Sequence, residues 1–376
     1  MVLTATRAPR AEHVGSLLRP PELLRARAAH REGRITLGQL REVEDRAILE
    51  ALRLQGEVGL DVLTDGEYRR ESWLSPFWDS LDGLTTASRP TVWIEWHGLP
   101  EGGPSQDELQ LAPVVVNARL RRRVPLLRAE AAFLLKHAPA PFKVTMPSPT
   151  MTATLYVPGI TDRAYPTPAD MVREVAELQV AEVEELADLG VGWVQVDSLR
   201  YLSLLDERLR QRIHGLGVDT GRLLEETIAL DNHVIGAAKR RGLTVGLHLC
   251  RGNNRSAWMA SGGYEPIAER LFAEILADRL LLEYDSERAG GFEPLRFVAP
   301  GKTVVLGLVS TKTPVLESQD DLCRRIEEAS RYVPIENLAL GPQCGFASTL
   351  LGNLITVDDQ RRKLELVVDT ARRVWG

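Results

Sequence analysis

Short apolar runs alternate along this chain with longer stretches in which apolar residues recur every three or four positions. The short runs predict strands at residues 12–16, 61–67, 142–146, 192–198, 244–250, 280–285, 303–310 and 338–345. The longer stretches predict helices at residues 40–58, 168–189, 222–241, 265–277, 318–332 and 358–374. Such alternation is typical of parallel strands joined by helices, and predicts an α/β fold, a (β/α)8 TIM barrel. A doubly wound open sheet is the alternative.

One stretch interrupts this alternation. Residues 91–97 alternate apolar with polar side chains, and a second apolar run at 112–118 follows a turn rich in glycine and proline. Two such runs predict a β-hairpin, inserted between the second and third strands of the barrel. We therefore expect a single barrel domain over residues 1–376, with a hairpin insertion at 86–135.

The composition narrows the class of protein. With 44% hydrophobic and 26% charged residues the chain resembles an ordinary soluble protein, and its net charge of −6 favours neither nucleic acid nor a membrane surface as partner. No apolar run reaches the roughly 20 residues that a membrane span needs, and residues 1–10 lack the apolar core of a signal peptide. Three widely spaced cysteines do not suggest a disulfide framework. We expect a cytoplasmic protein, with a homo-oligomer possible.

The cysteines suggest a metal site. His248 and Cys250 lie two residues apart at the end of a predicted strand, so their side chains point to the same face. An imidazole beside a thiol suits a soft divalent metal such as zinc, and Cys344 with a carboxylate could complete the set. Such a site could bind a substrate thiol as thiolate. The alternative is a buried histidine bonded to backbone and two core thiols; Cys323, inside a predicted helix, is expected to be structural.

Polar or glycine-rich groups follow all eight predicted strands. In a TIM barrel the catalytic residues come from these strand ends and the loops after them, so we expect the active site at that rim. Trp73, Trp78 and Trp258 lie near the rim and could stack on a flat ligand, or could be packing residues. Lys143 and Lys312 lie near strand ends and could meet an anionic substrate.

Taken in order, the strand-end motifs resemble those of the catalytic domain of cobalamin-independent methionine synthase, above all its short single-barrel members. The resemblance runs from about residue 10 to the C-terminus, and His-x-Cys with a distant Gln-Cys-Gly is its most specific part. The matching motifs are Val14-Gly-Ser-Leu-Leu-Arg-Pro20, Asp65-Gly-Glu-Tyr-Arg-Arg70, Val194-Gln-Val-Asp197, His248-Leu-Cys250, Leu281-Leu-Glu-Tyr-Asp285 and Gly341-Pro-Gln-Cys-Gly-Phe346.

The resemblance implies both a metal site and a reaction. It implies one zinc ion, with ligands at His248, Cys250, Glu283 and Cys344. It implies contacts to an amino-acid substrate from Ser16, Glu67 and Asp197. The implied enzyme is a methyltransferase of methionine biosynthesis. It moves a methyl or other alkyl group to a small-molecule thiol, homocysteine giving methionine, through a zinc-bound thiolate nucleophile.

The chain departs from the family pattern in two motifs. The family has Asp-Glu-Pro where this chain has Asp197-Ser-Leu. The family's proton-donating Asp-x-His-Ser loop corresponds to residues 308–314, which contain no histidine. The sequence therefore identifies no proton donor for the leaving group. It leaves the methyl donor open as well: a folate, a corrinoid, a simple methylated metabolite or an epoxide would suit the same thiolate chemistry.

Other readings of the same residues stay open. Ser16 could simply follow a turn glycine, Glu67 could pair with the neighbouring arginines, and Asp197 could cap a helix. Asp285 and Glu287 are acidic neighbours that could take the place of Glu283. At the level of function, the alternatives are an alkyltransferase with another thiol acceptor, of the epoxide–coenzyme M type, a metal-free enzyme resembling uroporphyrinogen decarboxylase, and a protein with a closed, structural zinc site.

Overall fold

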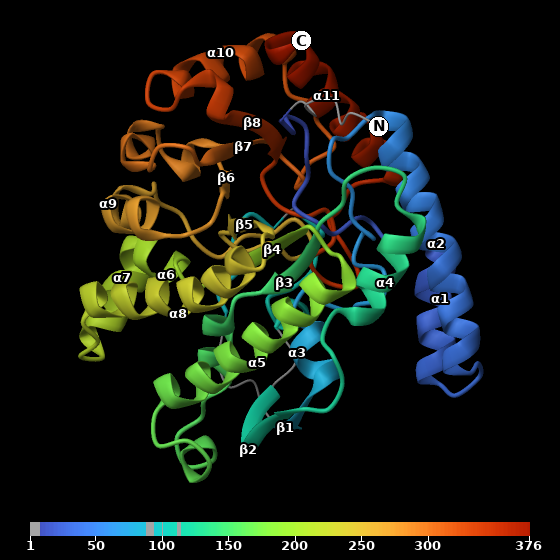
Figure 1. Cartoon of the computed structure of the whole chain (residues 1–376), viewed down its shortest axis with the longest axis vertical. Helices are drawn as coiled ribbons and strands as arrows, with labels where there is room; N and C mark the ends of the chain where they lie inside the picture. Colours follow the sequence, from blue (N-terminus) through green and yellow to red (C-terminus); the bar gives the residue numbers. More distant parts are fainter. Residues whose placement is uncertain (1–7, 88–93, 100, 111–113) are drawn as a thin grey trace.

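Six parallel strands form the central sheet, and they are neighbours in the order in which they occur in the chain. A computed structural model describes residues 8–87, 94–99, 101–110 and 114–376. The strands are β3 (Val144–Pro147), β4 (Trp193–Ser198), β5 (Thr244–Leu249), β6 (Arg279–Glu283), β7 (Thr303–Val309) and β8 (Leu338–Pro342). They are buried almost throughout, as expected for parallel strands covered by helices (Figure 1).

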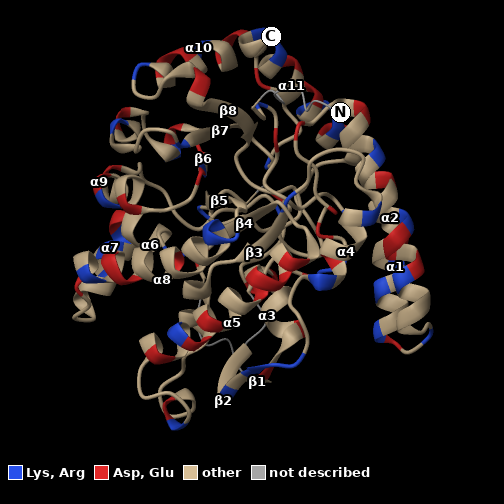
Figure 2. Cartoon of the chain, in the orientation of Figure 1, with Lys and Arg blue, Asp and Glu red and all other residues tan. Residues whose placement is uncertain are grey.

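Helices pack around this sheet, as the periodicity predicts. Six predicted helices are present with ends that shift by at most a few residues: α2 (Leu37–Val58), α5 (Pro168–Leu189), α8 (Thr220–Arg240), α9 (Glu265–Glu274), α10 (Gln319–Ser330) and α11 (Val357–Trp375). Five further helices were not predicted: α1 (Pro21–Arg31), α3 (Ser75–Ser80), α4 (Arg128–His137), α6 (Leu202–Leu205) and α7 (Glu207–Gly215). Charged side chains concentrate on the helices, whereas the central strands are largely uncharged (Figure 2).

The ends of the long helices have local causes. At the start of α11, the side chain of Thr356 accepts a hydrogen bond from the backbone of Asp359, and the Asp359 side chain accepts one in return. α5 begins with Pro168 behind the cap Thr167 and ends at Leu189, before the C-cap Gly190, whose φ of 96° suits glycine. These caps fix where each helix returns the chain to the barrel.

The first two barrel positions are taken by short segments in place of the strands predicted at 12–16 and 61–67. They form only single bridges, Ala11 to Leu340 of β8 and Leu63 to Phe142 just before β3. The Asp61 carboxylate accepts the backbone N–H groups of Arg10 and Ala11, at 2.7 and 2.8 Å. Because a side chain satisfies these groups, no regular ladder is needed there. The prediction of regular strands was wrong at these two positions, although the segments still link β8 to β3.

An antiparallel pair lies between the second segment and β3, formed by β1 (Leu81–Thr86) and β2 (Val114–Arg122). Its strands differ from those predicted at 91–97 and 112–118, of which residues 91–93 and 112–113 lie outside the described residues. His97 pairs instead with Trp258, through backbone hydrogen bonds of 2.8 and 3.0 Å. The boundary predicted at residue 135 falls inside α4. The division into one barrel domain with an insertion at 86–135 stays a prediction.

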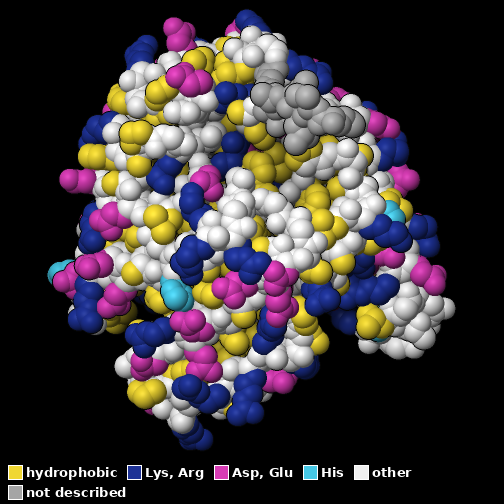
Figure 3. Space-filling view, viewed as in Figure 1, with side chains coloured by type: hydrophobic (Ala, Val, Ile, Leu, Met, Phe, Trp, Pro, Cys, Tyr) yellow, Lys and Arg dark blue, Asp and Glu magenta, His cyan; other side chains and the backbone are white. Residues whose placement is uncertain are grey.

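The outer surface carries charges of both signs. Figure 3 shows Lys and Arg interspersed with Asp and Glu over one face of the molecule. None of the helices in the described ranges combines the length and apolar character that crossing a membrane would require.

Candidate active site

Four side chains from the ends of β5, β6 and β8 meet at one point. His248 lies in β5, Cys250 directly follows β5, Glu283 ends β6, and Cys344 follows β8. One potential ligand atom from each lies within 4.8 Å of the others. The structure thus brings together all four residues for which the sequence predicts zinc binding.

One ring nitrogen of His248 is left without a partner. Its Nδ1 lies 3.1 Å from the carbonyl oxygen of Leu281, so the ring donates from that side. Its Nε2 is buried and has no hydrogen-bond partner among the described residues. A metal-binding histidine is oriented in this way, with one nitrogen tied to backbone and the other presenting a lone pair.

The two cysteines form a close pair. Their Sγ atoms lie 3.3 Å apart, and the backbone N–H of Gly252 donates to Cys250 Sγ at the same distance. The hydrogen bond between the thiols lowers the pKa of Cys344 and raises that of Cys250. The Cys344 sulfur is therefore the more readily deprotonated of the two, which favours the binding of a cation between them.

Glu283 provides the carboxylate of the four-residue cluster, and its acidic sequence neighbours do not belong to that cluster. It is fully buried, with Oε1 accepting the backbone N–H of Arg251 at 2.8 Å and Oε2 lying 3.3 Å from Arg288. Asp285 instead lies 3.4 Å from the same guanidinium. The partners on both oxygens orient the Glu283 carboxylate, which is the usual support for a metal ligand.

The donor set fits zinc. Two cysteine sulfurs, an imidazole with a free nitrogen and a carboxylate are ligands that zinc takes in proteins. The orphaned His248 Nε2 is the observation that a bound metal would explain, because a buried polar atom without a partner costs stability.

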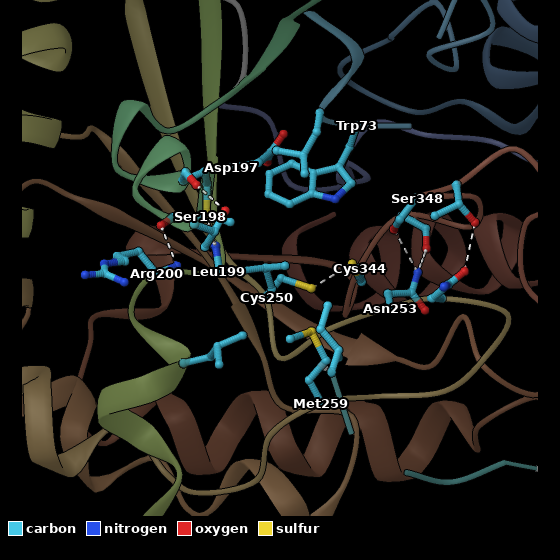
Figure 4. Close-up of a pocket in the computed structure, with 18 of the residues that line it drawn as sticks. Trp73, Asp197, Ser198, Leu199, Arg200, Cys250, Asn253, Met259, Cys344 and Ser348 are labelled. Carbon is cyan, nitrogen blue, oxygen red and sulfur yellow. Dashed lines mark hydrogen bonds between the residues drawn. The ribbon is translucent and has the colours of Figure 1, made fainter. Parts of the chain in front are cut away.

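A cavity of about 670 Å³ opens above this cluster. Figure 4 shows Cys250 and Cys344 in the middle of the residues that line it, between Trp73 and Met259. Three of the four candidate ligands line the cavity, and Glu283 lies behind them. The residues predicted to hold a substrate also line it: Ser16, Glu67 and Asp197.

Ser16 lies against the segment that carries Cys344. Its Oγ accepts the backbone N–H of Ala347 at 3.3 Å, and a Cβ on Gly345 would lie only 2.0 Å from that oxygen. A glycine is therefore required beside Cys344 for Ser16 to keep this position. The serine is more than a polar residue after a turn, because it touches the opposite wall of the site.

Glu67 is held in a strained conformation with one free oxygen. Its φ of 59° is uncommon for a residue other than glycine. Oε1 accepts a hydrogen bond of 2.8 Å from Thr145, and Oε2 is buried without a partner among the described residues. Arg70 lies 3.7 Å from Oε1, while Arg69 pairs with Asp45 instead. The ion pair weighed from sequence thus accounts for one oxygen only.

Asp197 ends β4 directly beside His248, its register partner in β5. Its Oδ1 accepts a hydrogen bond of 2.7 Å from Gln195. Burial raises the pKa of Asp197 to about 7. The role of helix cap is wrong for Asp197, since the backbone N–H groups of Leu199 and Arg200 donate to Met151 Sδ and Ser198 Oγ, and α6 begins only at Leu202.

The remaining candidates divide between the cavity and the packing around it. Trp73 and Trp78 line the cavity, whereas Trp258 stacks on His97 with ring centroids 4.7 Å apart. Lys143 is fully buried in an ion pair of 2.7 Å, and Lys312 donates to Asn253 at 2.7 Å. Neither lysine lines the cavity.

Sequence reasoning missed several residues of the cavity wall. Trp96 reaches it from the stretch predicted as a hairpin, and Arg200 reaches it from the loop after β4. Neither has a motif or a periodic pattern that points to a ligand. The only signal was position, since Arg200 follows the Asp197 motif by three residues.

Comparison with known proteins gives consistent matches over nearly the whole chain. Residues 9–373 match the family described as "Cobalamin-independent synthase, Catalytic domain". The uncharacterized protein YxjH of Bacillus subtilis is 36% identical over 369 residues, which cover 97% of this chain and 94% of that protein. A 5-methyltetrahydropteroyltriglutamate–homocysteine methyltransferase from a Synechococcus species is 23% identical over 342 residues, which cover 88% of this chain and 39% of that protein.

A solved structure confirms the fold. The B12-independent methionine synthase from Shewanella sp. W3-18-1, in complex with selenomethionine, superimposes with a TM-score of 0.73 at 20% identity. The match covers 98% of each chain. The α/β barrel predicted from the strand and helix pattern is thereby confirmed.

Proposed function

This chain belongs to the cobalamin-independent methionine synthase family, and we propose that it transfers a methyl group to the sulfur of homocysteine at a zinc site. The observation that carries the proposal is the cluster of His248, Cys250, Glu283 and Cys344 at the floor of a cavity. Membership of this family argues against the decarboxylase alternative.

The four clustered residues would hold the metal. Zinc bound there would supply an electron-rich centre that lowers the pKa of an added thiol towards neutrality. The chain's part is to keep the donors in place: Leu281 orients His248, and Arg251 orients Glu283. Because three of the donors line the cavity, a thiol can approach them from the open side, which favours a catalytic site over a closed structural one.

Two carboxyl groups beside the cluster favour an amino-acid thiol. The free Oε2 of Glu67 and the carboxyl group of Asp197 line the same cavity, where they would bind the ammonium group of homocysteine. A sulfonate, as in a coenzyme M acceptor, would be repelled by these groups. Ser16 would contribute a hydroxyl to the same substrate.

The reaction itself is a displacement at a methyl carbon. The thiol gives up its proton, a sulfur–carbon bond forms, and the bond between the methyl group and its donor breaks with the electron pair leaving on the donor. The donor then takes up a proton if its leaving atom is basic. The protein contributes by holding sulfur and methyl carbon in line and by excluding water from the cavity.

A cobalt(II)-substituted protein tests the proposal directly. Sulfur-to-metal absorption bands that grow on titration with homocysteine would support thiol binding at an open metal position. A larger response to coenzyme M than to homocysteine would favour the other acceptor class. Bands that ignore every thiol, or no cobalt binding, would contradict the proposal.

A further inference from the structure

One buried arginine side chain, that of Arg19, joins two loops around the cavity. Its Nη2 donates to the backbone carbonyl oxygens of Glu67 and Arg70, at 3.1 and 2.9 Å, and its Nε also donates to that of Arg70, at 3.2 Å. Its Nη1 donates to the carbonyl oxygens of Ala347 and Thr349, at 3.1 and 3.0 Å. One guanidinium group therefore binds two loops that are far apart in the sequence.

These two loops carry different parts of the candidate site. Glu67, a predicted substrate contact, belongs to the first loop and lines the cavity. Cys344, a candidate metal ligand, lies at the start of the second loop, which continues along the cavity wall to Thr349. Arg19 thus connects the loop that would bind the amino group of the substrate to the loop that would hold the metal.

The backbone of the segment that carries Arg19 makes matching contacts. The N–H of Leu17 donates to the carbonyl oxygen of Gly66 in the first loop, at 3.1 Å. The carbonyl oxygen of Ser16 accepts the N–H of Phe346 in the second loop, at 2.9 Å. The segment therefore lies between the two loops and is hydrogen-bonded to both.

The side chain of Arg19 binds the first loop at its strained residue. The two loops also meet directly, where the N–H of Trp73 donates to the carbonyl oxygen of Ser348 at 3.0 Å, but that contact is six residues beyond Glu67. Glu67 itself has a φ of 59°, and its own carbonyl oxygen accepts from Arg19. A residue in that conformation persists only where its surroundings hold it. Arg19 therefore helps to fix where the Glu67 carboxylate lies.

The contacts of Arg19 require an arginine in particular. Its five hydrogen bonds go to backbone oxygens, and it forms no ion pair with any residue that the structure describes. Burial lowers its pKa to about 10, so the group is still charged at neutral pH. A guanidinium group carries five N–H donors in a rigid plane, whereas a lysine has three on a single atom. A lysine could not hold both loops in the same way.

A fixed distance between the two loops would select a thiol by its length. In the proposed function, the ammonium group of homocysteine lies at Glu67 and its sulfur at the cluster that includes Cys344. Cysteine is shorter by one C–C bond of about 1.5 Å, so it would not reach both places at once. Misplacement by such a distance, or the loss of one methylene group, commonly costs at least about tenfold.

We propose that Arg19 sets the length of the thiol amino acid that the site accepts, by holding Glu67 at a fixed distance from the loop of Cys344. This inference rests on the proposed function, because it concerns the acceptor of the same site. Arg19 does not line the cavity. It is a positioning residue, which acts through the backbone of the two loops and touches neither the thiol nor the methyl donor.

Titration of the cobalt-substituted protein with homocysteine and with cysteine tests this inference, with sulfur-to-cobalt bands as the measure of binding. The wild type is expected to bind homocysteine at least about tenfold more tightly than cysteine. Arg19→Lys is expected to keep its cobalt and to reduce this preference to less than about threefold. Its affinity for 4-mercaptobutanoate, which has no amino group for Glu67, should equal that of the wild type. Arg122→Lys, which alters a contact with Glu182 away from the cavity, is the control and should keep the preference.

Each outcome of these titrations decides the inference. A lost preference with unchanged binding of 4-mercaptobutanoate would support it. A wild type without preference, an unchanged preference in Arg19→Lys, or an equal loss of affinity for every thiol would overturn it and leave the thiol site standing. Arg19→Gln is the second variant if Arg19→Lys does not fold, and failure of both to fold would overturn the inference, because Arg19 would then serve the fold alone. Wild-type cobalt bands that ignore every thiol would contradict the proposed function, and this inference with it.

Discussion

Cys250 and Cys344 are 94 residues apart in the sequence, and their sulfur atoms lie 3.3 Å apart. Cys250 follows β5 and Cys344 follows β8, with β6 and β7 between them in the sheet, so the tertiary fold brings the two together. Together with His248, whose Nε2 has no hydrogen-bond partner among the described residues, this pair is the core of the candidate zinc site.

Replacing one sulfur should therefore remove the metal. Cys344→Ala leaves three donors and is expected to reduce zinc from about one per chain to a small fraction, with methyl transfer lost in parallel. Zinc content and activity after dialysis against a weak chelator measure both effects. Cys323→Ala, in α10 away from the cluster, is the control and should retain both. Full activity of Cys344→Ala without metal would contradict the zinc assignment.

Glu67→Gln should weaken recognition of the substrate amino group. The amide keeps the hydrogen bond from Thr145 but loses the charge on the free oxygen. Loss of a charged hydrogen bond of about 1.5–3 kcal/mol predicts a KM for homocysteine at least about tenfold higher. The KM for 4-mercaptobutanoate, which lacks the amino group, should change little.

The exposed Glu71 provides the matched control for Glu67, because Glu71→Gln removes the same charge four residues away, outside the cavity. Equal effects of Glu67→Gln on both thiols would argue that Glu67 only supports the fold.

Gly345→Ala should displace Ser16 without unfolding the barrel. The added Cβ would lie 2.0 Å from Ser16 Oγ, so the serine must move from its place in the cavity wall. We expect a loss of activity of at least about tenfold, as small displacements of positioning residues commonly cause, with circular dichroism unchanged. Gly192→Ala is the control, because its Cβ would meet nothing within 4 Å. A fully active Gly345→Ala would show that the position of Ser16 is unimportant.

The strongly periodic parts of the fold were predictable from sequence. α5 begins and ends at the predicted residues because a threonine–proline start and a glycine end surround a long apolar pattern. The segments around Ala11 and Leu63 were predicted as strands, yet each forms only a single bridge, and the Asp61 side chain accepts the backbone N–H groups of Arg10 and Ala11. That contact joins residues about 50 positions apart, which no local pattern contains.

The part of the candidate site that lies in short sequence motifs was predictable. His248 and Cys250 share a face because a strand alternates, and the family resemblance supplied Glu283. Arg200 and Trp96 could not be found in this way. Both line the cavity, and the tertiary fold, not a local pattern, brings them there.

Glu12 should be essential for stability. It is fully buried and binds Lys143 at 2.7 Å and Arg279 at 2.5 Å. Burial alone would raise its pKa, but the two cations outweigh it and lower the pKa to about 2. Glu12→Gln leaves two buried cations without their anion and is expected to lower the free energy of unfolding by about 3–5 kcal/mol.

Urea unfolding at neutral pH measures this effect of Glu12→Gln. The comparison is Glu50→Gln, which removes an exposed pair with Arg53 on α2 and should cost less than about 1 kcal/mol. Similar losses in the two variants would contradict a structural role for the buried triad.

His13 should make the protein less stable in mild acid. Its Nε2 lies 2.9 Å from Gln55 Oε1, and burial together with the charge of Lys143 lowers its pKa from 6.5 to about 4. At pH values between these two pKa values, His13 is protonated in the unfolded chain and largely unprotonated in the folded protein. Stability is therefore intact above pH 6.5 and falls as the pH drops towards 4, by up to about 3 kcal/mol.

His13→Gln isolates this contribution, because glutamine can donate to Gln55 but does not take up the proton. The wild type should exceed the variant in unfolding free energy most clearly near neutral pH, and the difference should shrink by up to about 3 kcal/mol as the pH falls to about 4. Urea titrations at a series of pH values measure the difference. His233→Gln, at an exposed position on α8 beside Glu177, is the comparison variant. A difference between wild type and His13→Gln that stays constant with pH would mean that the folded protein accepts the proton at His13 as readily as the unfolded chain does.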